Sequence, residues 1–354
     1  MIDSLITRTF VNRRVSTFRI ATGSSDAEET TLVKLVSGDE FGVGAASPSD
    51  VTHETRRTVE EFLAKVPKKI VGTDETDIPK LHKRLDAVAP GNTAAKAAVD
   101  MAVYDLLSKR DRKPLHRFIG CADRPRMLTD MTIGIESKDV TVKKAVQYYK
   151  KGFRALKVKV GLDLENDVRR VAAVRDAVGP KVELRVDANQ GYSVEQAVSF
   201  SESMASLGVV VIEQPVRADD YAGLKAVKDR SRVPIMADEC VKDLADARRV
   251  VKDGSVDMIN IKLMKSAGLY GALAIDRLAA EAGIRTMIGC MGELQISIAA
   301  GLHFALGSEN LRYADLDSYF NILDDPTSGL EFEDGHLLAP RGPGLGISTP
   351  LDGG

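Results

Sequence analysis

Short apolar runs with strand character dominate the first 50 residues of the chain. Two of them, residues 31–36 and 41–44, lie on either side of the turn-forming tripeptide Ser-Gly-Asp at 37–39. Val, Leu, Thr and Phe favour extended structure, and Gly and Asp accept the backbone angles of tight turns. This pattern predicts a β-hairpin near the N-terminus.

From residue 49 to residue 107 the apolar positions follow a helical spacing instead. Asn92 or Thr93 is a suitable N-cap for a helix that runs to about Ser108, because short polar side chains bond the free N–H groups of a first turn. A strand-rich opening followed by helices predicts a separate α+β domain over residues 1–125.

Beyond residue 126 short apolar runs alternate with amphipathic stretches such as 165–178 and 193–207. The runs are Met131–Ile135, Ala155–Val160, Val182–Val186, Val209–Ile212, Ile235–Ala237, Met258–Ile261, Arg285–Ile288 and Leu311–Ala314. Eight strands alternating with helices predict an α/β protein, a (β/α)8 barrel of the TIM type, over residues 126–319. A doubly wound open sheet is the alternative, but no GxGxxG follows any run.

Composition excludes several classes of function. The 49 Lys+Arg and 51 Asp+Glu leave a net charge of −2, so no broad positive field attracts nucleic acid or an anionic membrane, and we expect neither as a partner. The three cysteines are far apart, which argues against a disulfide framework and a thiolate metal site. The first residues lack the pattern of a signal peptide, so a cytoplasmic location is expected.

Acidic residues follow three consecutive strands. Asp187, Glu213 and Asp238 are spaced by about one βα unit, and each comes directly after an apolar run. In a barrel the C-terminal strand ends meet at one face, so these carboxylates are expected to converge there. Converging carboxylates repel one another unless a cation lies between them, and all-oxygen ligation suits Mg²⁺. Single strand-end acids often cap helices, but three in register favour a metal site.

Lysines occupy the same strand ends. Lys157 and Lys159 are two residues apart and therefore point to one face of their strand, and Lys262 ends the strand four positions round the ring. Two lysines facing each other across a metal site can reach opposite faces of one carbon atom. Lys265, by contrast, is expected to be a solvated surface residue.

These motifs resemble the enolase superfamily, and within it the muconate-lactonizing-enzyme subgroup. The resemblance rests on KVK at 157–159, DAN at 187–189, EQP at 213–215, DE at 238–239 and NIK at 260–262. It covers nearly the whole chain and implies a capping domain at 1–125 that is completed by the C-terminal tail from about 320 to 354. The mandelate-racemase branch would carry a His after strand seven, where this chain has Gly-Cys-Met at 289–291.

The resemblance implies a chemistry of proton abstraction next to a carboxylate, for which such sites use a Lys or His base and Mg²⁺. One Mg²⁺ per subunit would bind Asp187, Glu213 and Asp238. Lys159 and Lys262 would act as acid and base on opposite faces, with Lys157 as their electrostatic partner. A lysine must be neutral to act as a base, and burial together with neighbouring cations is expected to favour that form.

The end of strand eight points to one branch of the subgroup. Asp315 and Asp317 lie on one side of an extended segment, which resembles the DxD motif by which dipeptide epimerases hold the substrate ammonium. This resemblance implies a dipeptide epimerase, an isomerase that inverts the α-carbon of the C-terminal residue by 1,1-proton transfer through an enediolate. One of the two acids could instead cap the following helix.

Three further residues are candidates for substrate contact. Glu293 looks like an acid that the family carries after strand seven and is expected to support the site. Thr132 could offer its hydroxyl to the substrate or simply pack on strand one. Arg19, near the capping-domain loop at 18–25 that would close over the substrate, could pair with an acidic side chain or point outward.

The preferred side chains of the dipeptide stay open: acidic, hydrophobic and cationic residues are all possible. The alternatives within the subgroup are an N-succinylamino-acid racemase, an o-succinylbenzoate synthase and a muconate-type cycloisomerase. Outside it, a non-catalytic barrel could serve as a binding or scaffold protein. A homo-oligomer is expected.

Overall fold

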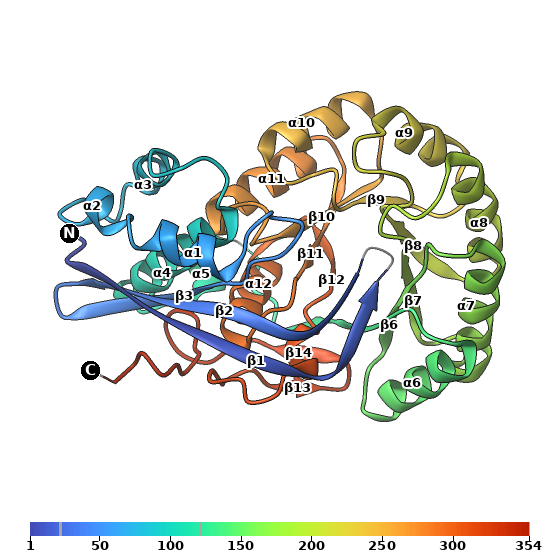
Figure 1. Ribbon diagram of the computed structural model, residues 1–354, viewed down its shortest axis with the longest axis horizontal. Coiled ribbons are helices and arrows are strands. Elements are labelled where there is room, and N and C mark those ends of the chain that lie inside the picture. Colours follow the sequence, from blue (N-terminus) through green and yellow to red (C-terminus); the bar gives the residue numbers. More distant parts are fainter. Residues whose placement is uncertain (21–22, 121, 354) are drawn as a thin grey trace.

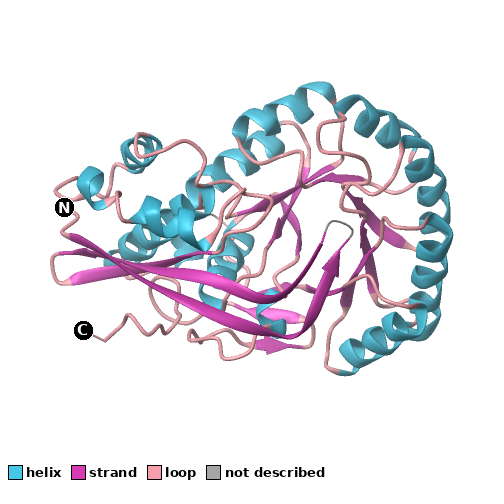
Figure 2. Ribbon diagram, viewed as in Figure 1, coloured by secondary structure: helices cyan, strands magenta, loops and turns pink. Residues whose placement is uncertain are grey.

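The computed structural model describes residues 1–20, 23–120 and 122–353. A three-stranded antiparallel sheet and a group of helices form the N-terminal part, and a ring of parallel strands with helices outside it forms the larger part (Figures 1 and 2). Among these residues no helix is both long and apolar enough to cross a membrane.

The N-terminal sheet contains the predicted hairpin. Its strands are β1 (Ser4–Ile20), β2 (Gly23–Ser37) and β3 (Glu40–Ala46), paired in that order. Ser37 pairs with Glu40 across the turn, so the hairpin prediction is confirmed. The far end of the β1–β2 hairpin reaches over the ring of parallel strands (Figure 1).

Five helices follow this sheet, and the fourth is the predicted one. They are α1 (Arg56–Leu63), α2 (Pro67–Ile70), α3 (Ile78–Asp86), α4 (Thr93–Arg110) and α5 (Leu115–Ile119). Asn92 occupies the N-cap position of α4, but its side chain makes no cap hydrogen bond. The buried carboxylate of Glu54 accepts hydrogen bonds from the N–H groups of Ala94 and Ala95 instead, which a local sequence pattern does not indicate.

Eight parallel strands and the helices between them form the barrel. The strands are β5 (Asp130–Ile133), β6 (Ala155–Lys159), β7 (Glu183–Asp187), β8 (Val209–Glu213), β9 (Ile235–Ala237), β10 (Met258–Lys262), β11 (Arg285–Gly289) and β12 (Leu311–Ala314). The helices are α6 (Lys138–Lys150), α7 (Leu164–Val178), α8 (Val194–Ser206), α9 (Tyr221–Arg230), α10 (Leu244–Asp253), α11 (Leu269–Glu281) and α12 (Gln295–Gly307), with a 3-10 turn η1 (Ser318–Asn321). The predicted fold class is confirmed.

Contacts between the first and last strands close the ring. Thr129, just before β5, forms a parallel bridge with Ala314 of β12, and its hydroxyl accepts a hydrogen bond from the Leu316 N–H at 2.9 Å. The Thr132 N–H donates to the Asp317 carboxylate at 2.5 Å. Side chains thus complete a seam that has little backbone pairing, and the open-sheet alternative is wrong.

The C-terminal segment returns to the N-terminal part of the chain. The short strands β13 (Phe332–Glu333) and β14 (His336–Leu338) form a sheet with β4 (Arg126–Leu128). Beyond them the segment is irregular but is held in place by hydrogen bonds. The Leu345 N–H donates to Asp105 of α4, and Lys34 of β2 donates to the Leu351 carbonyl. This packing supports the proposed division into a capping domain with a returning tail and a barrel.

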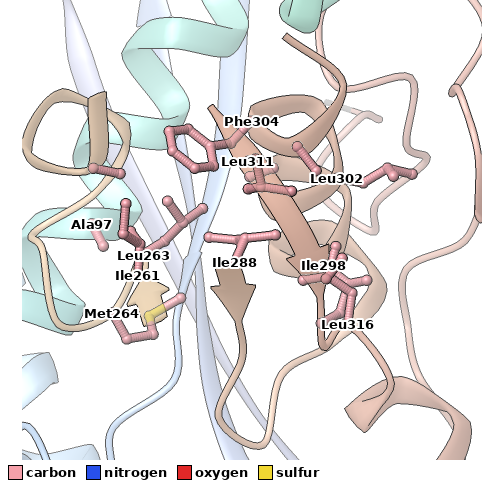
Figure 3. Close-up of a cluster of buried hydrophobic side chains, with 14 of the residues drawn as sticks. Ala97, Ile261, Leu263, Met264, Ile288, Ile298, Leu302, Phe304, Leu311 and Leu316 are labelled. Atoms are coloured by element: carbon pink, nitrogen blue, oxygen red, sulfur yellow. The ribbon is translucent and has the colours of Figure 1, made fainter. Parts of the chain in front are cut away.

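The core between the two parts is continuous. Helix α12 is almost entirely buried and carries Ile298, Leu302 and Phe304, which pack near Ile288 and Leu311 of the barrel strands (Figure 3). Apolar burial on this scale is the main favourable term in folding. The shared core fixes the capping helices against β10–β12 and so positions the hairpin over the barrel mouth.

Candidate active site

A cavity of about 850 Å³ lies between the barrel mouth and the β1–β2 hairpin. Lys157, Lys159, Asp238 and Lys262 line its floor, and residues from the hairpin, including Ser24, line the opposite side. Its volume suits a ligand of several hundred daltons. The predicted catalytic face is therefore the one that the cavity occupies.

The three predicted metal ligands converge. Asp187, Glu213 and Asp238 are buried, and each offers a carboxylate oxygen within 4.8 Å of the others. Burial and the repulsion of Asp187 raise the pKa of Glu213 to about 8. Carboxylates this close favour proton uptake or a bound cation. The donor set therefore fits a hard divalent cation such as Mg²⁺.

The other two acids of the trio respond to their lysine neighbours. Burial alone would raise the pKa of Asp238, but Lys262 and Lys265 outweigh it and lower that pKa well below its usual range. The pKa of Asp187 is likewise lowered, because Lys159 and Lys157 outweigh its burial. All three carboxylates thus take part in one network of charges.

The three predicted lysines lie in this network. The Lys157 ammonium is within 2.7 Å of Glu213, 2.8 Å of Asp315 and 3.1 Å of Asp187. Lys159 donates to Asp187 at 2.6 Å, and Lys262 donates to Asp238 at 2.9 Å. The predicted lysines of β6 and β10 therefore lie at the same barrel mouth, where each bonds a carboxylate of the trio.

Burial and the nearby carboxylates act in opposite directions on two of these lysines. Burial lowers the pKa of Lys262, but the carboxylates of Asp238 and Glu213 outweigh it and raise that pKa above its usual value. The same balance raises the pKa of Lys157 well above its usual range, with Asp315 the largest carboxylate contribution. Carboxylates, not neighbouring cations, dominate around these two lysines.

Lys265 is not a surface residue, so that expectation was wrong. It is 3% exposed, and its ammonium donates to the Asp238 carboxylate and main-chain carbonyl, each at 2.6 Å, and to the Asn260 carbonyl at 3.1 Å. A strand end followed by a tight turn brings it back under the mouth. The sequence offered one signal for this position: Lys265 lies only three residues after Lys262, the last residue of β10.

The pair at the end of β12 also lies in the cavity. Asp315 and Asp317 are 5% and 7% exposed and line the cavity wall, and each forms a hydrogen bond with Thr132. Burial and the neighbouring Asp315 raise the pKa of Asp317 to about 6. Two buried carboxylates beside a cavity form a site for a cationic group.

The remaining candidates differ in position. Thr132 lines the cavity. Glu293 is 2% exposed and accepts a hydrogen bond from the Met291 N–H at 2.8 Å, which stabilises the loop after β11. Arg19 has an exposed side chain that is not part of the cavity lining, and its carbonyl accepts the Ile135 N–H. The predicted loop at 18–25 includes residues 21–22, which lie outside the described residues.

Sequence reasoning missed the amide side chains of the site. Asn260 donates to Glu213 at 2.8 Å and Asn189 donates to Glu239 at 3.0 Å. The Gln214 side chain accepts the N–H groups of Asp238 and Cys240. All three lie inside the motifs NIK, DAN and EQP, so their position beside the acids was a usable signal. Asn260 thus orients the Glu213 carboxylate and Gln214 fixes the backbone at Asp238, the kind of support that neighbours of metal ligands commonly give.

The fold and the site together define a class: a capped (β/α)8 barrel whose mouth holds a carboxylate trio between lysines. Family models agree. The mandelate racemase / muconate lactonizing enzyme N-terminal domain matches residues 2–120, and the enolase C-terminal domain-like model matches residues 140–352. The chain belongs to the mandelate racemase / muconate lactonizing enzyme family, which confirms the resemblance inferred from its motifs.

Two relatives and one solved structure are informative. A hydrophobic dipeptide epimerase of Enterococcus faecalis is 39% identical over 94% of this chain and 95% of its own length. An L-Ala-D/L-Glu epimerase of Clostridium acetobutylicum is 36% identical over 93% and 94%. The solved structure of the Enterococcus faecalis dipeptide epimerase with Mg and the dipeptide L-Leu-L-Tyr has a TM-score of 0.95 and 37% identity, covering 98% of this chain and 99% of that one. The relatives are epimerases, so the prediction of an isomerase is confirmed.

Proposed function

We propose that the protein is a Mg²⁺-dependent dipeptide epimerase that inverts the α-carbon of the C-terminal residue. One observation carries this proposal: Asp238, which belongs to the carboxylate trio, and the Asp315–Asp317 pair line the same cavity, with Lys159 and Lys262 beside them. A dipeptide has an anionic and a cationic end, and the cavity offers a complementary group for each. A 37% identical relative was solved in complex with Mg and a dipeptide, which supports both the metal and the substrate class.

Asp187, Glu213 and Asp238 would hold one Mg²⁺ per subunit. When bound, the ion supplies positive charge to the substrate carboxylate and so stabilises the charge that develops as the α-proton leaves. Asp315 and Asp317 would accept hydrogen bonds from the substrate ammonium, which fixes the dipeptide in one orientation. Glu293 and Thr132 would support that wall of the cavity.

Lys159 and Lys262 would move the proton. One removes it from the α-carbon to leave an enediolate of the substrate, and the other donates a proton to the opposite face. Lys157, within 3.1 Å of Asp187, Glu213 and Asp315, would stay charged and link the metal-binding and ammonium-binding carboxylates. The protein would work in the cytoplasm as a homo-oligomer.

The first test is deuterium uptake at the α-carbon, followed by mass spectrometry in D₂O across a pool of L,L-dipeptides with and without Mg²⁺. We expect Mg²⁺-dependent uptake into one class of side chain. N-acetylated copies of the dipeptides and N-succinylamino acids serve as matched substrates that lack the ammonium. Uptake restricted to N-acylated amino acids would contradict the epimerase and support an N-succinylamino-acid racemase, and no uptake from any of these substrates would support a cycloisomerase or synthase.

The substrate-binding role of the strand-eight acids has its own test. The Asp317→Asn variant keeps an acceptor for the Thr132 N–H but loses the charge. We expect it to raise KM for free-amine dipeptides by about 10- to 100-fold, since a hydrogen bond to a charged group contributes about 1.5–3 kcal/mol. An equal effect on N-acetylated dipeptides would contradict ammonium binding by Asp317.

A further inference from the structure

Three buried polar side chains behind Lys159 have no place in the chemistry described above. Asp167 and Arg170 lie on α7, outside the barrel next to β6 and β7 (Figure 1), and Tyr192 follows β7. They are 2%, 5% and 5% exposed, and none of them lines the cavity.

Their hydrogen bonds converge on the backbone around Lys159. The Arg170 guanidinium donates to the Lys159 carbonyl at 2.8 Å and to Asp167 at 2.6 Å. The other Asp167 oxygen accepts the Gly161 N–H at 2.8 Å and the Tyr192 hydroxyl at 2.7 Å. This bracket, defined as Asp167, Arg170 and Tyr192, joins the end of β6 to the loop that follows Asp187.

The two loops also touch directly. Gly161 has a φ of +108°, and a Cβ added there would lie 2.3 Å from the Ala188 carbonyl oxygen. A Cβ added to Gly191 would lie 2.1 Å from the Gly161 carbonyl oxygen. Only glycine permits this approach. The glycine contact and the bracket together leave the ends of β6 and β7 little freedom to move relative to each other.

Stability alone does not account for such a bracket. Burying a charged pair costs desolvation energy, and well-packed apolar side chains of similar volume are often as stable or more so. Arg170 also keeps a buried nitrogen, Nη1, that has no hydrogen-bond partner. What an apolar replacement could not supply is the directional set of bonds to the Lys159 carbonyl and the Gly161 N–H.

We propose that Asp167, Arg170 and Tyr192 are positioning residues that set the place of the Lys159 ammonium relative to Asp187, 2.6 Å away, and so to one face of the substrate α-carbon. They act through the backbone and touch no substrate. This inference rests on the proposed epimerase function.

The support is one-sided. The Lys262 carbonyl accepts the N–H groups of Lys265 and Ser266 and the Ser266 hydroxyl. Among the residues that the structure describes, no hydrogen bond joins the bracket to β10. Loosening the bracket should therefore slow proton transfer on the Lys159 face of the substrate and leave the Lys262 face unchanged.

The test measures each face separately. The initial loss of the α-proton in D₂O is followed from each epimer of an active dipeptide, with Lys159→Ala and Lys262→Ala assigning each epimer to its lysine. For Tyr192→Phe and Arg170→Met we expect a loss of about 10- to 100-fold on the Lys159 face, the cost of a displacement of about 1 Å, and a change within twofold on the other. The ratio of the two rates does not depend on the fraction of folded enzyme.

Arg169→Met is the matched control, because Arg169 neighbours Arg170 on α7 but has a side chain that is 58% exposed; its rate ratio should equal that of the wild type. Equal losses on both faces in Tyr192→Phe and Arg170→Met would overturn the positioning role and leave only a structural one. A wild-type protein that exchanges the α-proton of neither epimer would overturn the proposed function, and this inference with it.

Discussion

The two ends of the cavity are built on different principles. At the barrel end, Lys157, Asp187 and Glu213 are at most 1% exposed, and Lys157 forms ion pairs with both carboxylates. At the capping end, Ser24 and Asp50 are exposed, and the carboxylate of Glu28 is held by Arg14. A buried network tolerates one arrangement, whereas exposed polar side chains can change at little cost. The barrel end thus suits a fixed chemistry and the capping end a variable choice of substrate.

The largest effect should come from removing a proton carrier at the barrel end. Lys262→Met should lower the rate of epimerisation by about 10²- to 10⁴-fold, the usual contribution of a general acid or base. The rate is measured by chiral chromatography of the active dipeptide. Lys252→Met, at an exposed position on α10, is the control for folding and should retain the wild-type rate. A Lys262→Met enzyme with more than a tenth of that rate would rule out the two-lysine mechanism.

The next prediction tests whether burial makes the ion pairs at the barrel end stronger than exposed ones. Lys265→Met removes the donor to the Asp238 carboxylate and carbonyl, and breaking a buried ion pair costs about 3–5 kcal/mol. We expect that loss of unfolding free energy in urea, and a fall of about 10- to 100-fold in Mg²⁺ affinity by calorimetry, because Asp238 loses its orienting partner.

Lys225→Met is the matched variant, since Lys225 forms an ion pair with Asp229 in which both side chains are nearly half exposed. Such pairs contribute at most about 1 kcal/mol. Equal losses in the two variants would show that the Lys265 contacts add nothing through burial.

How well the residues at each end of the cavity could be predicted depends on how far apart in the sequence their interaction partners lie. Each barrel acid ends or directly follows its own strand, so a local pattern located Asp187, Glu213 and Asp238. Lys265 was misplaced because its burial depends on a turn after β10 that folds it back under the mouth.

Tertiary contacts limited other predictions in the same way. Glu54 caps α4 from 40 residues away, and the bracket behind Lys159 joins α7 to the loop after β7. No local spacing marks such long-range partners. At the capping end the lining residues, such as Ser24, Glu28 and Asp50, belong to no recognised motif.

A smaller effect concerns an acid at the border of the two ends. Burial raises the pKa of Glu293 to about 7 from an ordinary 4.5. A raised pKa in the folded state means that stability is fully present below pH 4.5 and is lost as the pH rises through 7. Glu293→Gln cannot ionise, so it should match the wild type near pH 4.5 and exceed it by about 1–3 kcal/mol at pH 8.

Thermal unfolding across this pH range, with Mg²⁺ present, provides the measurement. Glu281→Gln, at an exposed site at the end of α11, should show no such pH-dependent difference. A Glu293→Gln variant that is less stable than the wild type at pH 8 would mean that the carboxylate has a charged partner in the folded protein.

The smallest effect is expected at the capping end, for Arg19→Ala. The exposed Arg19 side chain is outside the cavity lining, and the carbonyl that bonds Ile135 is kept in the variant. We therefore expect a change in unfolding free energy within about 0.5 kcal/mol and an unchanged kcat/KM for dipeptides with neutral side chains.

The decisive measurement is kcat/KM of the Arg19→Ala variant for dipeptides with an acidic side chain. A loss of kcat/KM for acidic dipeptides alone would show that Arg19 reaches the substrate when the dipeptide binds. The capping end would then select its substrate with side chains that are exposed to solvent in the free enzyme. If Arg19→Ala changes kcat/KM for acidic and neutral dipeptides equally, selectivity would instead lie in residues that already line the cavity, such as Glu28 and Asp50.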